Sequence, residues 1–384
     1  MKILSLFLCL LLLTGCRAND TEQTIPTTEP SVAPTQTVPP ETIKETEPPD
    51  PIRDMMDQMS LEERVGQLFL VRCNDAYAIE HIQQYHLGGF VLFGVDFQNE
   101  TISSMRDKLT EYQSAAKIPL LIAVDEEGGT VTRISSNPAF RSSKFLSPRN
   151  AYKQGGFDLA FQQEKEKAQL LSSLGINVNL GPVCDITTDP NAFMYSRSLG
   201  QDKSETGDFV FATVRAMLQE GVGSCLKHFP GYGNNPDTHT GIAVDSRPLA
   251  ELEETDLFPF ATGIAAECGS IMVSHTIVEC MDPELPASLS PAVHRYIREK
   301  MGFDGVIVTD DLEMQAITDL YGTGEAAVLA ILAGNDLLCS SDYAVQYEAV
   351  LAAVLDGRID IDILNNAVRN VLEWKQQMSL ILVG

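Results

Sequence analysis

Eight short apolar segments recur along residues 51–384, and the intervals between them are long enough for a helix. The segments are Leu68–Val71, Phe90–Phe93, Leu120–Val124, Ile176–Leu180, Gly223–Leu226, Ile271–Val273, Val306–Val308 and Leu337–Cys339. Continuous apolar runs of this length are typical of strands buried on both faces, as in a parallel sheet. Stretches of helical composition alternate with them or follow the last one: Asn99–Ala116, Phe157–Leu174, Glu205–Gln219, Leu249–Glu267, Pro291–Met301, Glu325–Ala333, Val345–Leu355 and Ile361–Gln377.

This alternation predicts an α/β fold, a single (β/α)8 barrel of the TIM type. A doubly wound two-layer sheet is the alternative. Ser60 and Glu63 have the spacing of a capping box, which indicates that a helix opens the domain. Charged or imidazole groups stand where the expected strands end, which in such barrels is where active sites are built: Asp125, Asp185, Lys227-His228, His275 and Asp310-Asp311.

Residues 1–15 resemble the signal peptide of a bacterial lipoprotein. Met1-Lys2 gives a positive start, the apolar run Ile3–Leu13 is too short to span a bilayer, and Thr14-Gly15 precede Cys16. In such proteins the cysteine is lipidated and becomes the mature N-terminus, so we expect an exported protein anchored to the outer face of the cell membrane. The alternative is an ordinary secretory signal in which Cys16 is incidental.

Residues 16–50 are predicted to form a disordered tether that begins at the lipidated cysteine. The segment consists largely of Thr, Pro and Glu and has almost no large apolar residue, so it cannot bury enough surface to offset its ordering entropy. Its prolines favour an extended chain with a maximal reach on the order of 100 Å, at ~3.1 Å per residue. The barrel is therefore assigned to residues 51–384.

The charge and the cysteines of residues 51–384 exclude several classes of function. This part holds 24 basic and 46 acidic residues, a formal net charge of −22, which repels nucleic acids and other polyanions. Its six cysteines show no CxxC spacing and lie mostly in apolar segments. We expect buried free thiols, with a disulfide framework as the alternative, and neither a metal site nor a cofactor.

The segment Lys227–Gly241 (KHFPGYGNNPDTHTG) has the composition of a catalytic loop. It places a Lys-His pair at the end of an apolar strand, and a Gly-rich turn leads to Asp237-Thr238-His239. Clusters of ionisable groups of this kind concentrate at functional sites. Asp237 could hold the tautomer of His239 and stabilise its imidazolium, following the logic of a catalytic triad.

Asp310 is the candidate nucleophile, because it ends the seventh apolar segment and is expected to point into the site. An ionised carboxylate there can attack a carbon that bears a leaving group and give a covalent intermediate. Nearby cations, Lys227 and Arg197, would keep its pKa low. Asp311 is more typical of a helix cap. A retaining glycosidase also needs a group that protonates the leaving oxygen and then deprotonates water, and His239 can do both.

Residues Lys227–Gly241 and Gly305–Met314 together resemble glycoside hydrolase family 3, in its bacterial β-N-acetylhexosaminidase branch. The resemblance covers nearly all of residues 54–340. It includes MSLEERVGQLFL at the start, AVDEEGGTVTR at the third strand and YSRSLG before the fifth.

The resemblance implies a role for each matching residue. The family nucleophile corresponds to Asp310, and its Asp-x-His acid/base dyad corresponds to Asp237 and His239. Sugar-binding positions of the family correspond to Asp125, Arg133, Arg197, Lys227 and His228. Two departures concern the catalytic loop: Tyr232 stands where family members usually have His, and the segment from Lys227 to His239 is one residue shorter than in many relatives. The conformation of that loop is therefore left open.

These assignments predict a retaining exo-β-N-acetylhexosaminidase that removes terminal β-linked N-acetylglucosamine from saccharides or peptidoglycan fragments (muropeptides). We expect a monomer that meets the membrane through its lipid anchor only and binds no nucleic acid. A phosphorylase is one alternative, because a neutral His in place of a carboxylate would not repel an incoming phosphate. A catalytically inactive, tethered wall-binding lipoprotein is the other.

Overall fold

The computed structural model describes residues 50–238 and 241–382. The predicted signal peptide, Cys16 and nearly all of the predicted tether lie outside the described residues, and so does His239. In the part of the chain that is described, none of the helices combines the length and the apolar character that a membrane span requires. The described cysteines are all free thiols, and all but the half-buried Cys280 are buried.

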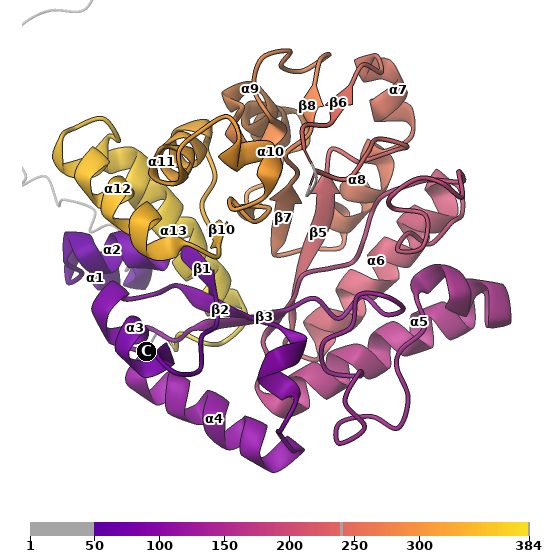
Figure 1. The fold of residues 1–384 in the computed structure, drawn as a ribbon, viewed down its shortest axis with the longest axis horizontal. Coiled ribbons are helices and arrows are strands. Elements are labelled where there is room, and N and C mark those ends of the chain that lie inside the picture. Colours follow the sequence, from indigo (N-terminus) through magenta and orange to yellow (C-terminus); the bar gives the residue numbers. More distant parts are fainter. Residues whose placement is uncertain (1–49, 239–240, 383–384) are drawn as a thin grey trace, which may run out of the picture. The chain divides into compact units, whose positions relative to one another are not determined.

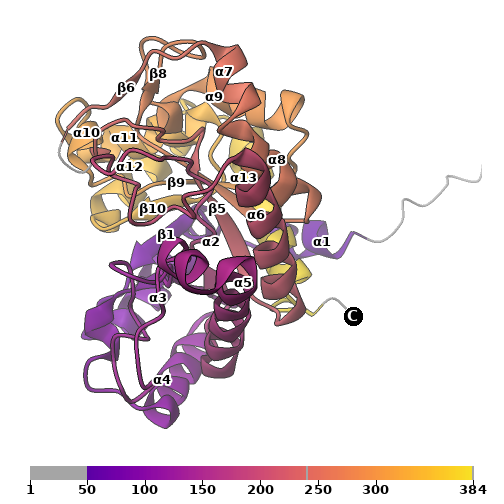
Figure 2. The ribbon, with the colours of Figure 1, turned by 90° about the vertical axis from the view of Figure 1, so that its right-hand side faces the viewer.

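Eight parallel strands form one sheet that curls into a barrel, with helices around it (Figures 1 and 2). The strands are β1 (Phe69–Arg72), β2 (Gly89–Leu92), β3 (Leu121–Val124), β4 (Val178–Asn179), β5 (Gly223–Phe229), β7 (Ser270–Val273), β9 (Val306–Thr309) and β10 (Leu338–Ser340). Their order is β10-β1-β2-β3-β4-β5-β7-β9, and a bridge between Val308 and Leu337 joins the two ends. Each strand coincides with one predicted apolar segment. The (β/α)8 barrel is confirmed, and the doubly wound sheet, which would stay open, is excluded.

The helices follow the predicted alternation, with shifted boundaries. They are α1 (Pro51–Asp57), α2 (Leu61–Gln67), α3 (Ala78–Tyr85), α4 (Ile102–Ala115), α5 (Pro148–Leu174), α6 (Lys203–Gln219), α7 (Leu249–Glu254), α8 (Leu257–Ala265), α9 (Pro291–Arg295), α10 (Gln315–Thr318), α11 (Thr323–Ala333), α12 (Tyr343–Leu355) and α13 (Ile361–Gln377). The capping box of Ser60 and Glu63 opens α2 as predicted. A π-helical turn, Tyr296–Lys300, continues α9 to the end of the predicted stretch.

Several parts of the fold differ from the prediction. The short helices α1, α3 and α10 lie in none of the predicted stretches. The single helix expected over Leu249–Glu267 is two helices, because the chain leaves helical geometry at Thr255, the C-cap of α7. Asp256 then turns its buried carboxylate to Arg247 at 2.8 Å. A small sheet of β6 (Val244–Asp245) and β8 (Ile277–Val278) was not predicted, and both views show it beside α7 (Figures 1 and 2). The two residues of β4 are both buried and lie within a longer apolar run, whereas each of β6 and β8 has one residue that is not buried, which gives a weaker signal.

The end of the barrel where the strands begin is closed by the last helix, α13. Val371 and Trp374 of this helix belong to the same buried cluster as the residues that fill the barrel. Gly223 and Gly269 stand at or next to the starts of β5 and β7, and a Cβ at either would lie within 3 Å of the Trp374 indole. Glycine is therefore required for the helix to approach the strands this closely. The opposite end, where the strands finish, stays open for a site.

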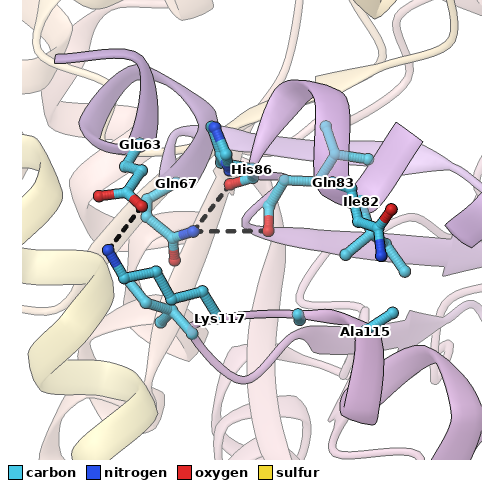
Figure 3. Close-up of a pocket in the computed structure, with 10 residues that line it drawn as sticks. Glu63, Gln67, Ile82, Gln83, His86, Ala115 and Lys117 are labelled. Carbon is cyan, nitrogen blue, oxygen red and sulfur yellow. Dashed lines mark hydrogen bonds and ion pairs between the residues drawn. The ribbon is translucent and has the colours of Figure 1, made fainter. Parts of the chain in front are cut away.

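A cavity of about 250 Å³ lies at the closed end, lined in part by residues that precede β1, β2 and β3 (Figure 3). An ion pair of Glu63 and Lys117, 2.6 Å apart, lies at its edge. The amide of Gln67 donates to the carbonyl of His86, and its Oε1 accepts from the buried Lys375 of α13 at 2.7 Å. Burial lowers the pKa of Lys375 from the ordinary 10.5 to about 7.

Because the pKa of Lys375 is lowered, we expect the free energy of unfolding to depend on pH. This dependence is separate from catalysis. Between about pH 7 and 10.5 the unfolded chain binds a proton at this lysine that the folded protein does not, so stability should rise with pH. The slope is up to about 1.4 kcal/mol per pH unit. Denaturant unfolding at several pH values should show this contribution in the native chain and its loss in Lys375→Met. If the free energies of unfolding of the two proteins changed in parallel with pH, the lowered pKa of Lys375 would be contradicted.

Candidate active site

A cavity of about 810 Å³ opens at the carboxyl ends of the strands. Seven predicted site residues line it: Asp125, Arg133, Arg197, Lys227, His228, Asp237 and Asp310. They come from β5 and from the segments that follow β3, β4, β5 and β9, as expected for a barrel enzyme. The structure thus brings together every predicted catalytic and sugar-binding residue among those it describes.

Asp310 is held at the mouth of the barrel by a backbone hydrogen bond to the end of the neighbouring strand, β7. It directly follows the buried strand β9, and its N–H donates to the carbonyl of Val273 at 3.1 Å. The neighbouring Asp311 accepts from the hydroxyl of Ser341 at 2.6 Å and from the N–H of Glu313 at 3.0 Å. Asp311 is therefore tied to the scaffold. The carboxylate of Asp310 accepts from the N–H of Asp311 at 2.9 Å, and both side chains line the cavity.

Lys227 and Asp125 form an ion pair on one wall of the cavity. The Lys227 ammonium lies 2.6 Å from Asp125 Oδ1 and 2.7 Å from Glu127 Oε1. Arg133 lies 3.6 Å from the other oxygen of Asp125. Burial by itself lowers the pKa of Lys227, but the attraction of Asp125 and Glu127 outweighs it, so the pKa lies above the ordinary value. Lys227 thus stays a cation although only 2% of its side chain is exposed.

Arg197 is oriented by two partners behind the cavity. Its Nε and Nη2 donate to the two oxygens of Glu127 at 2.9 and 2.6 Å. Nη2 also lies 3.2 Å from Nε2 of His228, whose Nδ1 is 2.8 Å from Asp185. Since an arginine donates there, Nε2 accepts and Nδ1 carries the proton toward Asp185. Asp185 is therefore a supporting group, which also accepts from the backbone N–H of His228.

His275 has a supporting place as well. Its Nδ1 lies 2.7 Å from the Ser288 hydroxyl and its Nε2 3.0 Å from the Asp311 carbonyl, and the side chain is fully buried. It therefore braces the segment that carries Asp310 and Asp311. It is not among the residues that line the cavity.

Tyr232, where family members usually have His, is packed into the base of the catalytic loop. Its side chain is 1% exposed, and its ring meets those of His228 and Phe193 edge to face. Its N–H donates to Asp185 at 2.7 Å, and its hydroxyl is hydrogen-bonded to that of Thr238. The described part of the loop is therefore fixed at both ends, up to the residue before His239.

Two glycines set the path of this loop. Gly231 and Gly233 have φ values of 118° and 53°, which residues with a Cβ rarely adopt. A Cβ would also meet the carboxylate of Asp256 at Gly231 and the guanidinium of Arg247 at Gly233, each at 2.7 Å. The loop therefore lies directly on the ion pair of Arg247 and Asp256. This answers, for the described residues, the question of its conformation that the sequence left open.

Sequence reasoning missed several residues of the site. Arg72 and Phe93 line the cavity at the ends of β1 and β2, and the guanidinium of Arg72 lies over the Phe93 ring at 4.6 Å. Glu126 and Glu127 support the cavity from behind. The signal for these two was available in the run Asp125-Glu126-Glu127, since carboxylates that directly follow a buried strand must find partners.

One group of possible metal ligands occurs among the residues that the structure describes. Atoms of Cys73, Asp75 and Asp96 lie within 4.8 Å of one another. Asp75, however, already pairs with Lys108 at 2.6 Å and accepts from the Tyr112 hydroxyl at 3.0 Å. Burial, and next to it the charge of Asp96, raises the pKa of the Cys73 thiol, which disfavours the thiolate that a metal needs. The group is better explained by its internal contacts.

Comparison with known proteins identifies the family and the fold. Residues 60–374 match the model of the glycosyl hydrolase family 3 N-terminal domain. The chain is 33% identical to beta-hexosaminidase A of Pseudoalteromonas piscicida over 276 residues, which covers 67% of this chain and 46% of that protein. It is 32% identical to a beta-hexosaminidase of Xylella fastidiosa over 305 residues, covering 78% and 89%.

Among solved structures, the glycoside hydrolase family 3 beta-N-acetylglucosaminidase from Paenibacillus sp. is similar with a TM-score of 0.79 and 32% identity. The match covers 85% of this chain and 64% of that one. The chain thus spans about half of the first relative and about two thirds of this structure, and the matched part is the barrel with its cavity.

Proposed function

Because the chain belongs to glycoside hydrolase family 3, we propose that it removes terminal β-linked N-acetylglucosamine from saccharides, with retention at the anomeric carbon. The observation that carries this proposal is the set of polar side chains that line the cavity together with Asp310. They include cationic, anionic and imidazole groups, namely Asp125, Arg133, Arg197, Lys227 and His228. Such a set can accept hydrogen bonds from some sugar hydroxyls and donate to others. The matched relatives are hexosaminidases, which supports N-acetylglucosamine as the sugar.

The proposed reaction has two steps. In the first, a carboxylate oxygen of Asp310 attacks the anomeric carbon while the bond to the leaving oxygen breaks, and His239 gives its proton to that oxygen. In the second, His239 takes a proton from water, and the resulting hydroxide displaces Asp310 from the sugar. Two displacements at one carbon leave its configuration unchanged. Asp237 lines the cavity two residues before His239 and would steady the imidazolium.

The proposal is tested by product analysis on β-linked N-acetylglucosaminides, with β-glucosides and β-galactosides of the same leaving group as controls. We expect free N-acetylglucosamine as product and a preference of at least tenfold for the N-acetylated sugar. The reaction should be repeated with inorganic phosphate. Accumulation of N-acetylglucosamine 1-phosphate would assign a phosphorylase instead, and no turnover of any β-glycoside would favour a binding protein.

We also propose that the natural substrates are peptidoglycan fragments and that the enzyme is held at the outer face of the cell membrane by lipid on Cys16. The sequence pattern of residues 1–16 and the Pro/Thr/Glu composition of residues 17–50 support this location. An anchored exo-enzyme would meet wall fragments there. We expect the enzyme to cleave muropeptides that carry a terminal N-acetylglucosamine and to leave those without it unchanged, which chromatography of the products can show.

Removal of the lipidation site should detach the protein. We expect Cys16→Ala to move the protein to the soluble fraction or to leave it held by an uncleaved signal. A net charge of −22 over residues 51–384 gives the barrel no attraction to an anionic lipid surface. A variant that begins at Pro51 should keep full activity on small substrates, because the described cavity contains no residue before Arg72. Loss of that activity would show that the N-terminal segment contributes to the site.

A further inference from the structure

The two carboxylates that follow Asp125 are buried and do not line the cavity. Glu126 is fully buried and Glu127 is 6% exposed, and the cavity residues include Asp125 but neither of them. A buried carboxylate is costly unless it is paired and hydrogen-bonded. Their partners therefore show what the two side chains are for.

Glu126 is used to hold the loop that carries Arg133. One of its oxygens accepts the N–H groups of Arg133 and Ile134, both at 2.8 Å, and the other accepts from the hydroxyl of Ser135 at 2.5 Å. These contacts are to the backbone and to a neutral hydroxyl. Glu126 thus shapes the loop without acting on the charges of the cavity.

Glu127 contacts two proposed sugar-binding cations directly. One oxygen lies 2.7 Å from the Lys227 ammonium and 2.6 Å from Nη2 of Arg197, and the other accepts from Nε of Arg197 at 2.9 Å. The two cations come from β5 and from the segment after β4. Glu127 is therefore the point at which two separate parts of the barrel are joined behind the cavity.

The negative charge of Glu127 is needed for this arrangement. Lys227 and Arg197 repel each other, and the charge of Arg197 works to lower the pKa of Lys227. Burial works to raise the pKa of Glu127, but Lys227 and Arg197 outweigh it and hold that pKa well below the ordinary value. The carboxylate is thus ionised at every pH at which the enzyme would work, and it offsets the repulsion.

The backbone of Glu127 is fixed as well. Its carbonyl accepts from the buried ammonium of Lys167 at 2.6 Å, and Lys167 pairs with the buried Glu164 at 2.6 Å within α5. Because both the backbone and the carboxylate have fixed partners, Glu127 has little freedom to move toward a ligand. Its effect on a sugar must pass through Lys227 and Arg197.

We propose that Glu127 is a positioning residue, whose carboxylate holds Lys227 and Arg197 in the geometry and charge state that bind the sugar. The inference rests on the proposed function for the identity of that sugar. It extends that function by a residue that never touches the substrate. The same carboxylate also helps to keep Lys227 protonated.

Glu127→Gln is the direct test, because it keeps the shape of the side chain and removes its charge. We expect kcat/KM to fall roughly 100-fold, as a displaced binding group can cost, mainly through KM. The pKa of Lys227 should fall, because Lys227 keeps only Asp125 as an anionic partner beside Arg197. Glu127→Asp retains the charge at a shorter reach, so it should raise KM but leave the pKa of Lys227 close to its native value.

Asp336→Asn is the matched control. Asp336 is also a buried carboxylate paired with an arginine, Arg298, at 2.5 Å, but it precedes β10 at the closed end of the barrel. Its replacement should lower stability and leave KM and the pKa of Lys227 unchanged. A general loss of packing would instead affect both variants alike.

A measurement without substrate separates this inference from the proposed function. The pKa of Lys227, followed by NMR of labelled lysine side chains, should be lower in Glu127→Gln than in the native protein. If the native protein cleaves no N-acetylglucosaminide, the proposed function fails, but this titration still tests Glu127. An unchanged Lys227 titration, or a native KM in the folded variant, would overturn the inference. If Glu127→Gln does not fold, KM in Glu127→Asp decides, and a native KM there would overturn it.

Discussion

Replacing Asp310 by Ala should abolish turnover, with kcat reduced by at least about 10⁴-fold. The methyl group cannot attack the anomeric carbon, so no glycosyl intermediate forms, and losses of this size are typical when a catalytic nucleophile is removed. Asp310 is half-buried at the end of β9 and makes no contribution to the apolar clusters. The variant should therefore fold, and thermal unfolding should show a midpoint within a few degrees of the native protein.

The neighbouring carboxylate provides the control for Asp310. Asp311→Asn removes a negative charge from the same cavity, but its amide oxygen can still accept from the N–H of Glu313, and its amide nitrogen can donate to the hydroxyl of Ser341. We expect turnover within about tenfold of the native value. The native enzyme should also release its first product in the β configuration, which NMR can follow before mutarotation. An inverted first product would exclude Asp310 as a covalent nucleophile.

The second large effect is expected for His239, and its size should depend on the leaving group. Without an acid, the leaving oxygen of a disaccharide must depart as an alkoxide, so His239→Ala should lower kcat/KM by roughly 10²- to 10⁴-fold on chitobiose. An aryl glycoside with an acidic phenol barely needs protonation and should lose far less in the glycosylation step.

The leaving-group series itself identifies the role of His239. A plot of log(kcat/KM) against the pKa of the phenol should become steeper in His239→Ala than in the native protein. Asp237→Asn should change the slope in the same direction but less, since it leaves the imidazole in place. Equal losses on all substrates would mean that His239 only positions the sugar.

The barrel could be predicted because its signal is local. A strand that is buried on both faces has a short continuous apolar run as its sequence. Each of the eight predicted runs coincides with one observed strand. Where burial gives no such run, prediction was wrong or silent. The two-residue strands β6 and β8 were not predicted. The helix break at Thr255 was not predicted either, because the residues on both sides have a helical composition.

The positions of the candidate site residues also followed from the sequence, because strand order and strand polarity carry the end of every strand to the same face of a barrel. Asp125, Lys227 and Asp310 could be predicted to lie together because each stands at the end of a strand. The family resemblance then added Arg133 and Arg197, which composition alone would leave as surface arginines. Their chemical roles stay predictions until the variants are measured.

What the sequence could not determine is which charges pair across the barrel. Lys227 meets Asp125 and Glu127, and Arg197 meets Glu127, over separations of about 70 to 100 residues. Ionisable groups that far apart in the chain come within 3 Å only when the barrel closes, and burial then decides the sign of each pKa shift. The same holds for Lys375, whose neutral amine follows from packing at the closed end. Short-range pattern therefore determined the fold and the location of the site, whereas the tertiary structure alone decided which residues hold it in shape.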